Sequence, residues 1–224
     1  MIRSLFIVFI LFSCGSLQSG EEILRKSITF HDPEEKWGKL QEKIRVRSDF
    51  VYPNTSLDGL MIGLDNAKQL VSYYNLSFDQ EILFTDSTCT VISGDKTCEQ
   101  AAWTKNFYHF ILGLPMTLKN DDGIIHELTL DTTFHGIPSY RVAIDFEKEN
   151  WHFYFDKVDY HLVGFAFNKN FEVKAEEILT EELIEIDGMN LPKTRYWWIT
   201  TDSLAPIYSG KDEIIGSSTW VHTY

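Results

Sequence analysis

Histidine is the side chain best suited to acid–base catalysis and metal binding near neutral pH, and this chain contains seven. The pair His126-Glu127 begins like the helical zinc-protease motif, which needs a second histidine one turn later. Position 130 is Leu instead, and the alternation of His126, Leu128 and Leu130 indicates a strand. His126 is therefore expected to be a hydrogen-bonded core histidine or, alternatively, a polar anchor in a ligand cavity.

Two later histidines lie close together in the sequence, around a predicted hairpin. His152 shares a strand face with Tyr154, and His161 follows just past the turn, so the three could form a polar cluster or, as the minor alternative, a metal site. An envelope hydrolase built on a His/carboxylate cluster would require His126, His152 and a carboxylate within hydrogen-bond reach. The sequence contains no nucleophile elbow, P-loop, dinucleotide-binding glycine motif or EF-hand loop. We therefore predict a non-enzymatic protein that uses no cofactor and no metal.

Glutamates recur in a later predicted strand, over residues 173–187. Glu177, Glu181 and Glu185 alternate with leucines, so a glycosidase-like pair of carboxylates is possible in principle. The preferred interpretation is a solvated strand whose charges prevent pairing with another chain.

The composition is that of an acidic, aromatic-rich globular chain. Its 224 residues suit one domain with a sizeable core. The chain has 16 Phe, 10 Tyr and 6 Trp, and a formal net charge of −13. This charge argues against a nucleic-acid partner, because phosphate binding requires a surface of Lys and Arg.

The N-terminus has the features of a secretion signal. Arg3 precedes an apolar run over residues 5–12, which is shorter than the roughly 20 residues of a membrane-spanning helix. The sequence LFSC, which ends at Cys14, resembles the bacterial lipobox, in which the signal is removed before a cysteine that is then acylated. The alternative is an ordinary signal peptide followed by a chance cysteine.

A lipid anchor would hold the mature chain in the cell envelope. We predict a signal peptide over 1–13, a lipidated Cys14 with a tether over 14–20, and a single domain over 21–224. Several acyl chains on one cysteine form a stable anchor, because each buried CH₂ contributes about 0.8 kcal/mol. Gly15 stands where an Asp would retain the protein at the inner membrane, so we expect the outer membrane and a periplasm-facing protein.

Cys89 and Cys98 are the two remaining cysteines of the mature chain. In an oxidising compartment they are expected to form a disulfide. A closed loop of this length gives a stabilisation of about 2.5–3 kcal/mol. Metal binding is the weaker interpretation, because neither a Cys-x-x-Cys motif nor an adjacent His pair completes a site.

Helical patterns occur in two places. The first begins at the capping box Ser19-x-x-Glu22 and stops at Asp32-Pro33. The second lies within 98–118, where apolar residues recur every three or four positions until Gly113 and Pro115 end the helix. Its apolar stripe consists of Trp103, Phe107, Phe110 and Leu114.

The rest of the chain has the two-residue period of strands. In 44–52, for example, Ile44, Val46, Phe50 and Tyr52 alternate with charged residues. About ten or eleven short strands joined by tight turns predict an antiparallel meander, and the absence of βαβ alternation argues against a Rossmann or TIM-barrel enzyme.

Two segments resemble the lipoprotein-carrier superfamily of the LolA/LolB type. The segment FYFDKVDYHLVGFAF (153–167) is similar to its strand–turn–strand hairpin, and IDGMNLPKTRYWW (186–198) is similar to its Gly-x-x-Leu-Pro strand entry. More narrowly, 21–37, 106–122 and 151–162 resemble a family of bacterial envelope lipoproteins. The resemblance implies a mainly β (α+β) fold, a half-open barrel with an N-terminal helix and one inserted helix over the concave face.

A curved sheet with a continuous apolar inner face must be covered or filled, because exposed apolar patches of that size are rare in soluble proteins. We expect a membrane-anchored lipoprotein that binds a hydrophobic or amphipathic ligand, such as a lipid or acyl group, on the concave face. The alternative is a structural or interaction protein whose own helix fills the barrel. The expected ligand-lining residues are Trp103, Phe107, Phe110, Leu114, His126, Leu128, Tyr140, Phe153 and Trp198.

Overall fold

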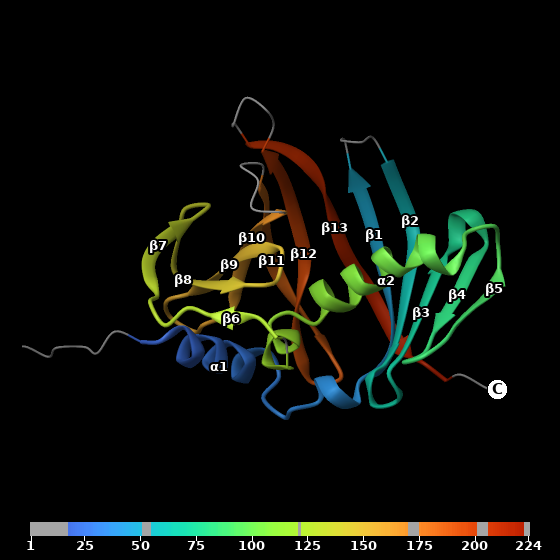
Figure 1. Ribbon diagram of the computed structural model, residues 1–224, viewed down its shortest axis with the longest axis horizontal. Coiled ribbons are helices and arrows are strands. Elements are labelled where there is room, and N and C mark those ends of the chain that lie inside the picture. Colours follow the sequence, from blue (N-terminus) through green and yellow to red (C-terminus); the bar gives the residue numbers. More distant parts are fainter. Residues whose placement is uncertain (1–17, 51–54, 121, 170–174, 201–205, 222–224) are drawn as a thin grey trace, which may run out of the picture.

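Segments with a two-residue period form strands, and these strands belong to a single sheet (Figure 1). The computed structural model describes residues 18–50, 55–120, 122–169, 175–200 and 206–221. In these residues the chain forms two α-helices, α1 (Gly20–His31) and α2 (Cys98–Leu112), and thirteen strands. The strands are β1 (Gln41–Phe50), β2 (Thr55–Asp65), β3 (Leu70–Asn75), β4 (Gln80–Phe84), β5 (Cys89–Ser93), β6 (Ile124–Ile125), β7 (Leu130–Phe134), β8 (Ile137–Asp145), β9 (Glu149–Asp156), β10 (Leu162–Lys169), β11 (Ala175–Ile186), β12 (Met189–Thr200) and β13 (Pro206–Thr219). The predicted signal peptide and Cys14 lie outside the described residues.

The sheet is a half-open barrel, as expected. Its strand order is β5-β4-β3-β2-β1-β13-β12-β11-β10-β9-β8-β6, with β7 also paired to β8. All neighbouring pairs are antiparallel. The last strand, β13, joins the two halves of the meander because it lies between β1 and β12. The edge strands β5 and β6 stand at opposite ends of this order, so the barrel is not closed.

The alternation of apolar and polar residues along each strand determines which side chains are buried in the core. In β1, Ile44, Val46 and Ser48 are buried, whereas Arg45 and Arg47 are exposed. One large cluster of buried side chains contains residues of both helices and of both halves of the sheet. None of the helices in the described part of the chain has the length and apolar sequence needed to cross a membrane.

The strand predicted around His126 is interrupted. Ile125 pairs with Ile144 and Leu130 pairs with Arg141, so four residues, 126–129, stand opposite only two on β8. The surplus makes 126–129 leave the edge of the sheet, and the Thr129 hydroxyl donates a hydrogen bond of 2.8 Å to the carbonyl of residue 18. This break is one reason that thirteen strands form where about ten or eleven were expected.

Helix α1 begins and ends where the sequence predicts. The Ser19 side chain accepts a hydrogen bond of 3.2 Å from the Glu22 amide at the N-terminus, and Asp32 caps the C-terminus. Ile23 and Leu24 are buried against the sheet. The helix thereby closes one end of the barrel, beside β8 and β12 in Figure 1.

His31 fixes the end of α1 to the sheet. Its Nε2 accepts a hydrogen bond of 2.9 Å from the Leu162 amide, so the proton is on Nδ1, which donates to the Asn190 carbonyl. The side chain is fully buried, and this burial lowers its pKa from 6.5 to about 4. His31 is therefore a neutral link between α1, β10 and β12.

Candidate ligand-binding face

Helix α2 lies across one face of the sheet, in front of β1, β2 and β3 in Figure 1. The Phe107 ring lies 5.6 Å from the indole of Trp197 on β12, and the Phe110 ring lies 5.2 Å from that of Trp151 on β9. The sheet curves around the helix, so two strands on different sides of it are in contact with α2. This face of the sheet is thus the concave, inner face.

The predicted stripe of α2 is rotated from the face that is most deeply buried. The buried helix residues are Ala101, Tyr108, Ile111 and Leu112. Phe107 and Phe110 are partly buried at the sides, and Trp103 is 62% exposed. Trp103 was expected among the ligand-lining residues, but it is exposed because the sheet covers the side of the helix that carries Ala101, Tyr108, Ile111 and Leu112.

Aromatic rings form a continuous contact from solvent to the inner face. Trp103 stacks on Phe107 with 4.9 Å between ring centroids and an interplanar angle of 8°. Phe107 contacts Trp197, and the Trp197 indole lies 6.0 Å from the Phe50 ring at the end of β1. Offset and tilted rings at these distances attract each other by about 0.5–1.5 kcal/mol per pair. We call these four residues the aromatic path.

A polar group of side chains is buried beneath the middle of α2. The Tyr108 hydroxyl lies 3.3 Å from the Ser48 hydroxyl on β1, in hydrogen-bonding range. Burial, and secondarily the Asp212 carboxylate, raise the pKa of Tyr108 well above its usual value. Tyr108 is therefore a neutral phenol that anchors the helix to the sheet.

Arg195 on β12 and Asp212 on β13 form a buried ion pair in the same region. Both side chains are 1% exposed. The Arg195 Nη1 donates a hydrogen bond of 3.1 Å to the Pro192 carbonyl, and the Asp212 carboxylate also accepts one of 2.9 Å from the Trp197 indole. The second carboxylate oxygen is thus bonded to a residue of the aromatic path. No motif in the sequence predicted this pair, although an Arg on the same strand face as Trp197 could have indicated it.

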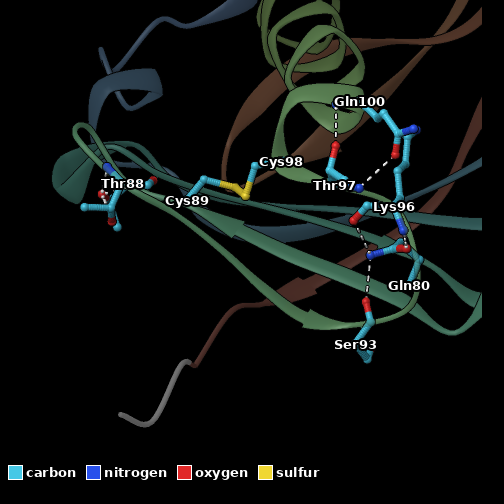
Figure 2. Close-up of a disulfide and its surroundings, with 9 residues drawn as sticks. Gln80, Thr88, Cys89, Ser93, Lys96, Thr97, Cys98 and Gln100 are labelled. Carbon is cyan, nitrogen blue, oxygen red and sulfur yellow. Dashed lines mark hydrogen bonds between the residues drawn. A yellow bond between two sulfur atoms is a disulfide. The ribbon is translucent and has the colours of Figure 1, made fainter.

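The N-terminus of α2 is attached to the sheet by a disulfide between Cys89 of β5 and Cys98, as predicted (Figure 2). Thr97 and Gln100 form a capping box, with reciprocal hydrogen bonds of 3.3 and 2.9 Å. The Gln80 side chain completes the attachment, because it bonds to the Ser93 carbonyl at 2.6 Å and to the amide of residue 96 at 2.6 Å. This end of the helix is therefore fixed covalently and by hydrogen bonds.

The C-terminus of α2 turns at Gly113, as the sequence predicts. A glycine is needed at this position because of close packing. It does not adopt a left-handed backbone conformation, since its φ is −90°. A Cβ at this position would lie 2.2 Å from the Trp37 indole. The Leu114–Pro115 peptide is cis, and Leu114 is fully buried. The middle of α2 contacts the sheet through the side chains of Phe107 and Tyr108, which meet Trp197 and Ser48.

Five predicted ligand-lining residues belong to the core or pack against it. Phe153 and Leu114 are fully buried, and Phe107 and Phe110 are partly buried under α2. Tyr140 packs against the same core and stacks on a tyrosine of the β9–β10 turn at 5.9 Å, on the α1 side. Of these five residues, Phe107 and Phe110 are the two that lie between the helix and the sheet with part of their surface accessible.

Three other predicted residues are not on the concave face, which corrects the prediction. His126 and Leu128 are exposed on the segment that leaves the edge of the sheet. Trp198 follows Trp197 on β12, so it lies on the opposite, outer face, where its ring is 4.5 Å from His135 and 5.7 Å from Tyr208.

The outer face carries a second apolar cluster under the turn between β7 and β8. Phe134 stacks on Tyr154 at 3.9 Å, and it packs with Val163 and Leu179. His135 lies 3.4 Å from the carboxylate of Glu177, one of the glutamates considered as a catalytic pair. The hairpin thus covers part of the outer face of the sheet.

His126 is neither a core histidine nor a cavity anchor. Its Nε2 lies 2.7 Å from Asp145, whose other carboxylate oxygen accepts a hydrogen bond from Asn150. The hydrogen bond from His126 is the main cause of the lowered pKa of Asp145. His152 is near enough that the Asp145 charge affects its pKa, which burial lowers. His126 follows the edge strand β6 and Asp145 ends β8, and both side chains are exposed, apart from the concave face.

The predicted cluster of His152, Tyr154 and His161 does not form. His161 instead pairs with Asp159 at 2.6 Å in the β9–β10 turn. Asp156, Asp159 and His161 place ligand atoms within 4.8 Å of one another. The Asp156 carboxylate already accepts the backbone amides of this turn, a structural role that explains the grouping.

A hollow of about 450 Å³ lies at the other end of the molecule from the disulfide, outside the concave face. It is lined by Gln18, Ser19, Glu21, Glu127, Leu128 and Thr129. Its walls are the start of α1 and the segment that leaves the edge of the sheet. Leu128, predicted as a ligand contact, is part of this hollow instead.

Similar architecture occurs in solved structures. A LolA superfamily protein from Nitrosomonas europaea superposes with a TM-score of 0.57 and 11% identity, over 92% of this chain and 95% of that one. A putative outer membrane lipoprotein-sorting protein domain from Vibrio parahaemolyticus has a TM-score of 0.49 and 10% identity, over 92% and 95% of the two chains. A DUF1329 family protein from Desulfovibrio piger has a TM-score of 0.48 and 9% identity, with the same coverage of 92% and 95%.

By sequence, no protein-family model and no curated protein matches the chain. The common features with the first structure extend over nearly the whole of both chains. An antiparallel sheet that curves around an inserted helix, with a second helix at the N-terminus, agrees with the fold that the sequence resemblance implied. The chain therefore has the fold of the LolA superfamily.

Proposed function

We propose that this protein is an envelope lipoprotein that binds an apolar or amphipathic ligand, such as a lipid or acyl group, between α2 and the concave face of its sheet. The observation that carries the proposal is the aromatic path, Trp103–Phe107–Trp197–Phe50, which leads from an exposed helix surface to the inner face. Aromatic and aliphatic walls suit an acyl chain, because burial of each CH₂ contributes about 0.8 kcal/mol. The protein has no catalytic role in this proposal.

Helix α2 acts as a lid in this proposal. Its N-terminus is held by the Cys89–Cys98 disulfide and its C-terminus by close packing of Gly113 on Trp37. Between these points, the side chains of Phe107 and Phe110 separate the helix from the sheet. A ligand that displaces these two rings would enter without breaking a backbone hydrogen bond of the sheet.

The second part of the proposal concerns location. The apolar run over 5–12 and the sequence LFSC support removal of a signal peptide and acylation of Cys14. The glycine at position 15 supports the outer membrane, with the folded domain in the periplasm. The matching solved structures contribute the fold alone to this inference.

Binding is tested with the soluble domain expressed from Gly15. Nile red is a suitable probe because it is neutral, whereas an anionic dye would be repelled by the net charge of −13. We expect saturable fluorescence enhancement, competition by an uncharged acyl lipid such as a monoacylglycerol, and lipid in the native mass spectrum. A protein that is empty and gives no titration would contradict the binding proposal.

A second candidate function is that of a structural or interaction lipoprotein whose interior is permanently filled by α2. The buried contact of Tyr108 with Ser48, beside the Arg195–Asp212 pair, favours it, because polar groups this deep tie the helix to the sheet. The test is Phe107→Asp, with Trp103→Asp as the exposed control on the same helix. A lid should stay folded and lose Nile red binding with Phe107→Asp, whereas a permanent filling should unfold. Trp103→Asp should stay folded in both cases.

A further inference from the structure

Three exposed apolar side chains surround the point at which the described chain begins. They are Leu128, Leu130 and Val158, which are 68%, 41% and 87% exposed. Val158 is the most exposed of the large apolar side chains in the described residues. We call these three residues the N-terminal rim. Their exposure is unfavourable in water, because an apolar side chain is stabilised when it is removed from water.

Hydrogen bonds and an ion pair hold the rim around residue 18. The Thr129 hydroxyl donates to the Gln18 carbonyl at 2.8 Å, between Leu128 and Leu130 in the chain. The Gln18 side chain donates to the Tyr160 hydroxyl at 3.2 Å, in the turn that carries Val158. The same turn is joined to β7 by the Lys157–Asp131 ion pair at 2.8 Å. The two parts of the rim are thus connected through the start of the chain.

We infer that the N-terminal rim rests on the surface of a lipid bilayer. The inference depends on the proposed acylation of Cys14, which is four residues before Gln18. Four residues span at most about 14 Å when fully extended. A diacylated or triacylated cysteine lies at the level of the headgroups, whose layer is about 5–7 Å thick on each side of the bilayer. Gln18 must then lie close to the membrane, and the apolar rim around it can insert among the headgroups.

The charges near the rim agree with a contact that is apolar and not electrostatic. Lys157 is paired with Asp131, and Lys26 is paired with Glu22 at 2.8 Å. Glu127 adds a negative charge next to Leu128, and the whole chain carries −13. A protein with this charge gains nothing from anionic lipids, so a zwitterionic membrane is the proper partner. The short tether favours the bilayer over a protein partner as the occupant of the rim.

This contact would orient the molecule. In Figure 1 the long axis is horizontal, with α1, β6 and β7 at one end and β3, β4 and β5 at the other. The rim belongs to the first end, and the disulfide at the start of α2 belongs to the second. The protein would then stand on the membrane, and the N-terminus of α2, with Trp103, would point away from it.

The experiment uses the full, acylated chain in phosphatidylcholine vesicles. Val158→Cys introduces the reactive thiol, since Cys89 and Cys98 are joined in a disulfide and Cys14 is acylated in this proposal. The thiol carries an environment-sensitive fluorophore, and the vesicles contain lipids with a spin label near the headgroup. The control is Phe78→Cys, which is also on a hairpin turn and is 70% exposed, near the opposite end of the strand order.

We expect loss of fluorescence at position 158 and none at position 78. Acyl groups on Cys14 with no loss at position 158, or with equal loss at both positions, would overturn the orientation and leave the anchor intact. A protein that carries no acyl mass and does not float with the vesicles would instead overturn the anchor, and this inference with it.

Discussion

The indole nitrogen of Trp197 on β12 donates a hydrogen bond of 2.9 Å to the carboxylate of Asp212 on β13. The same carboxylate is paired with Arg195, and both charged side chains are 1% exposed. The ion pair thus holds the Trp197 indole of the aromatic path in place through a hydrogen bond. A charge in an apolar interior is tolerated only with a counter-charge and hydrogen bonds, which these three residues supply to one another.

Asp212→Ala should be strongly destabilising. The substitution leaves the Arg195 guanidinium buried without its counter-charge, which costs about 3–5 kcal/mol in the free energy of unfolding. Urea unfolding followed by circular dichroism measures this loss. The control is Glu213→Ala, one residue further along β13, whose carboxylate pairs with Arg47 at 2.8 Å near the surface. Its loss should not exceed about 1 kcal/mol, and equal losses in the two variants would contradict a special role for the buried pair.

The stability of the protein should fall between pH 6.5 and pH 4 because of His31. Its pKa is about 4 in the folded protein and 6.5 in the unfolded chain. Within this window the unfolded state binds a proton and the folded state does not, so acid favours unfolding. The contribution is complete above pH 6.5 and decreases as pH falls to about 4, with a total of about 3 kcal/mol at 1.36 kcal/mol per pKa unit.

His31→Gln separates this effect from the titration of carboxylates. Glutamine can donate and accept hydrogen bonds but does not titrate in this range. Urea midpoints measured from pH 7 to pH 4 should decline more steeply in the natural protein than in the variant. Parallel curves would show that protonation of His31 is not linked to unfolding.

Removal of the disulfide should loosen the N-terminus of α2. The cysteines are separated by 9 positions, and for a loop of this length Cys89→Ser with Cys98→Ser should lower the free energy of unfolding by about 2.5–3 kcal/mol. Amides at the start of α2 should exchange hydrogen faster in the double variant. A reducing agent should lower the urea midpoint of the natural protein and leave that of the variant unchanged. A double variant as stable as the oxidised protein would contradict this prediction.

Gly164 on β10 allows the β7–β8 hairpin to cover the outer face. A Cβ at this position would lie 2.6 Å from the Phe134 ring and 2.3 Å from the Ile178 carbonyl oxygen. Gly164→Ala should therefore destabilise the fold by about 1–3 kcal/mol, as overpacking does. Gly216→Ala on β13 is the matched control, because no atom lies within 4 Å of its Cβ position. Thermal unfolding of both variants tests this, and a smaller effect at position 164 than at position 216 would refute it.

Several local features followed from the sequence because short-range chemistry determines them. The N-cap at Ser19 depends on residues within one helical turn. The sequence also predicts the end of α2 at Gly113, although a glycine is required there by its packing against the distant Trp37. The pairing of Cys89 with Cys98 followed from their being the two cysteines left for an oxidising compartment. The alternation of Ile44, Val46 and the arginines of β1 fixed which side chains face the core.

The positions of His126 and Leu128 could not be read in this way. Their alternation with Leu130 fits a strand. However, β6 and β7 both pair with β8, and their registers leave 126–129 without a place at the sheet edge. The polar pair that His126 forms with Asp145 joins residues 19 positions apart. Such a contact depends on strand register, which an alternating pattern does not specify.

The amino-acid sequence was enough to predict the alternation along the strands, the two helices and the disulfide. The folded chain was needed to show which face of α2 is buried, that Trp197 faces inward while Trp198 faces outward, and that Arg195 meets Asp212 beneath the helix. The physical reason is that a period of two or 3.6 residues assigns side chains to faces without saying what each face meets. Curvature of the sheet and the pairing of distant strands make that choice.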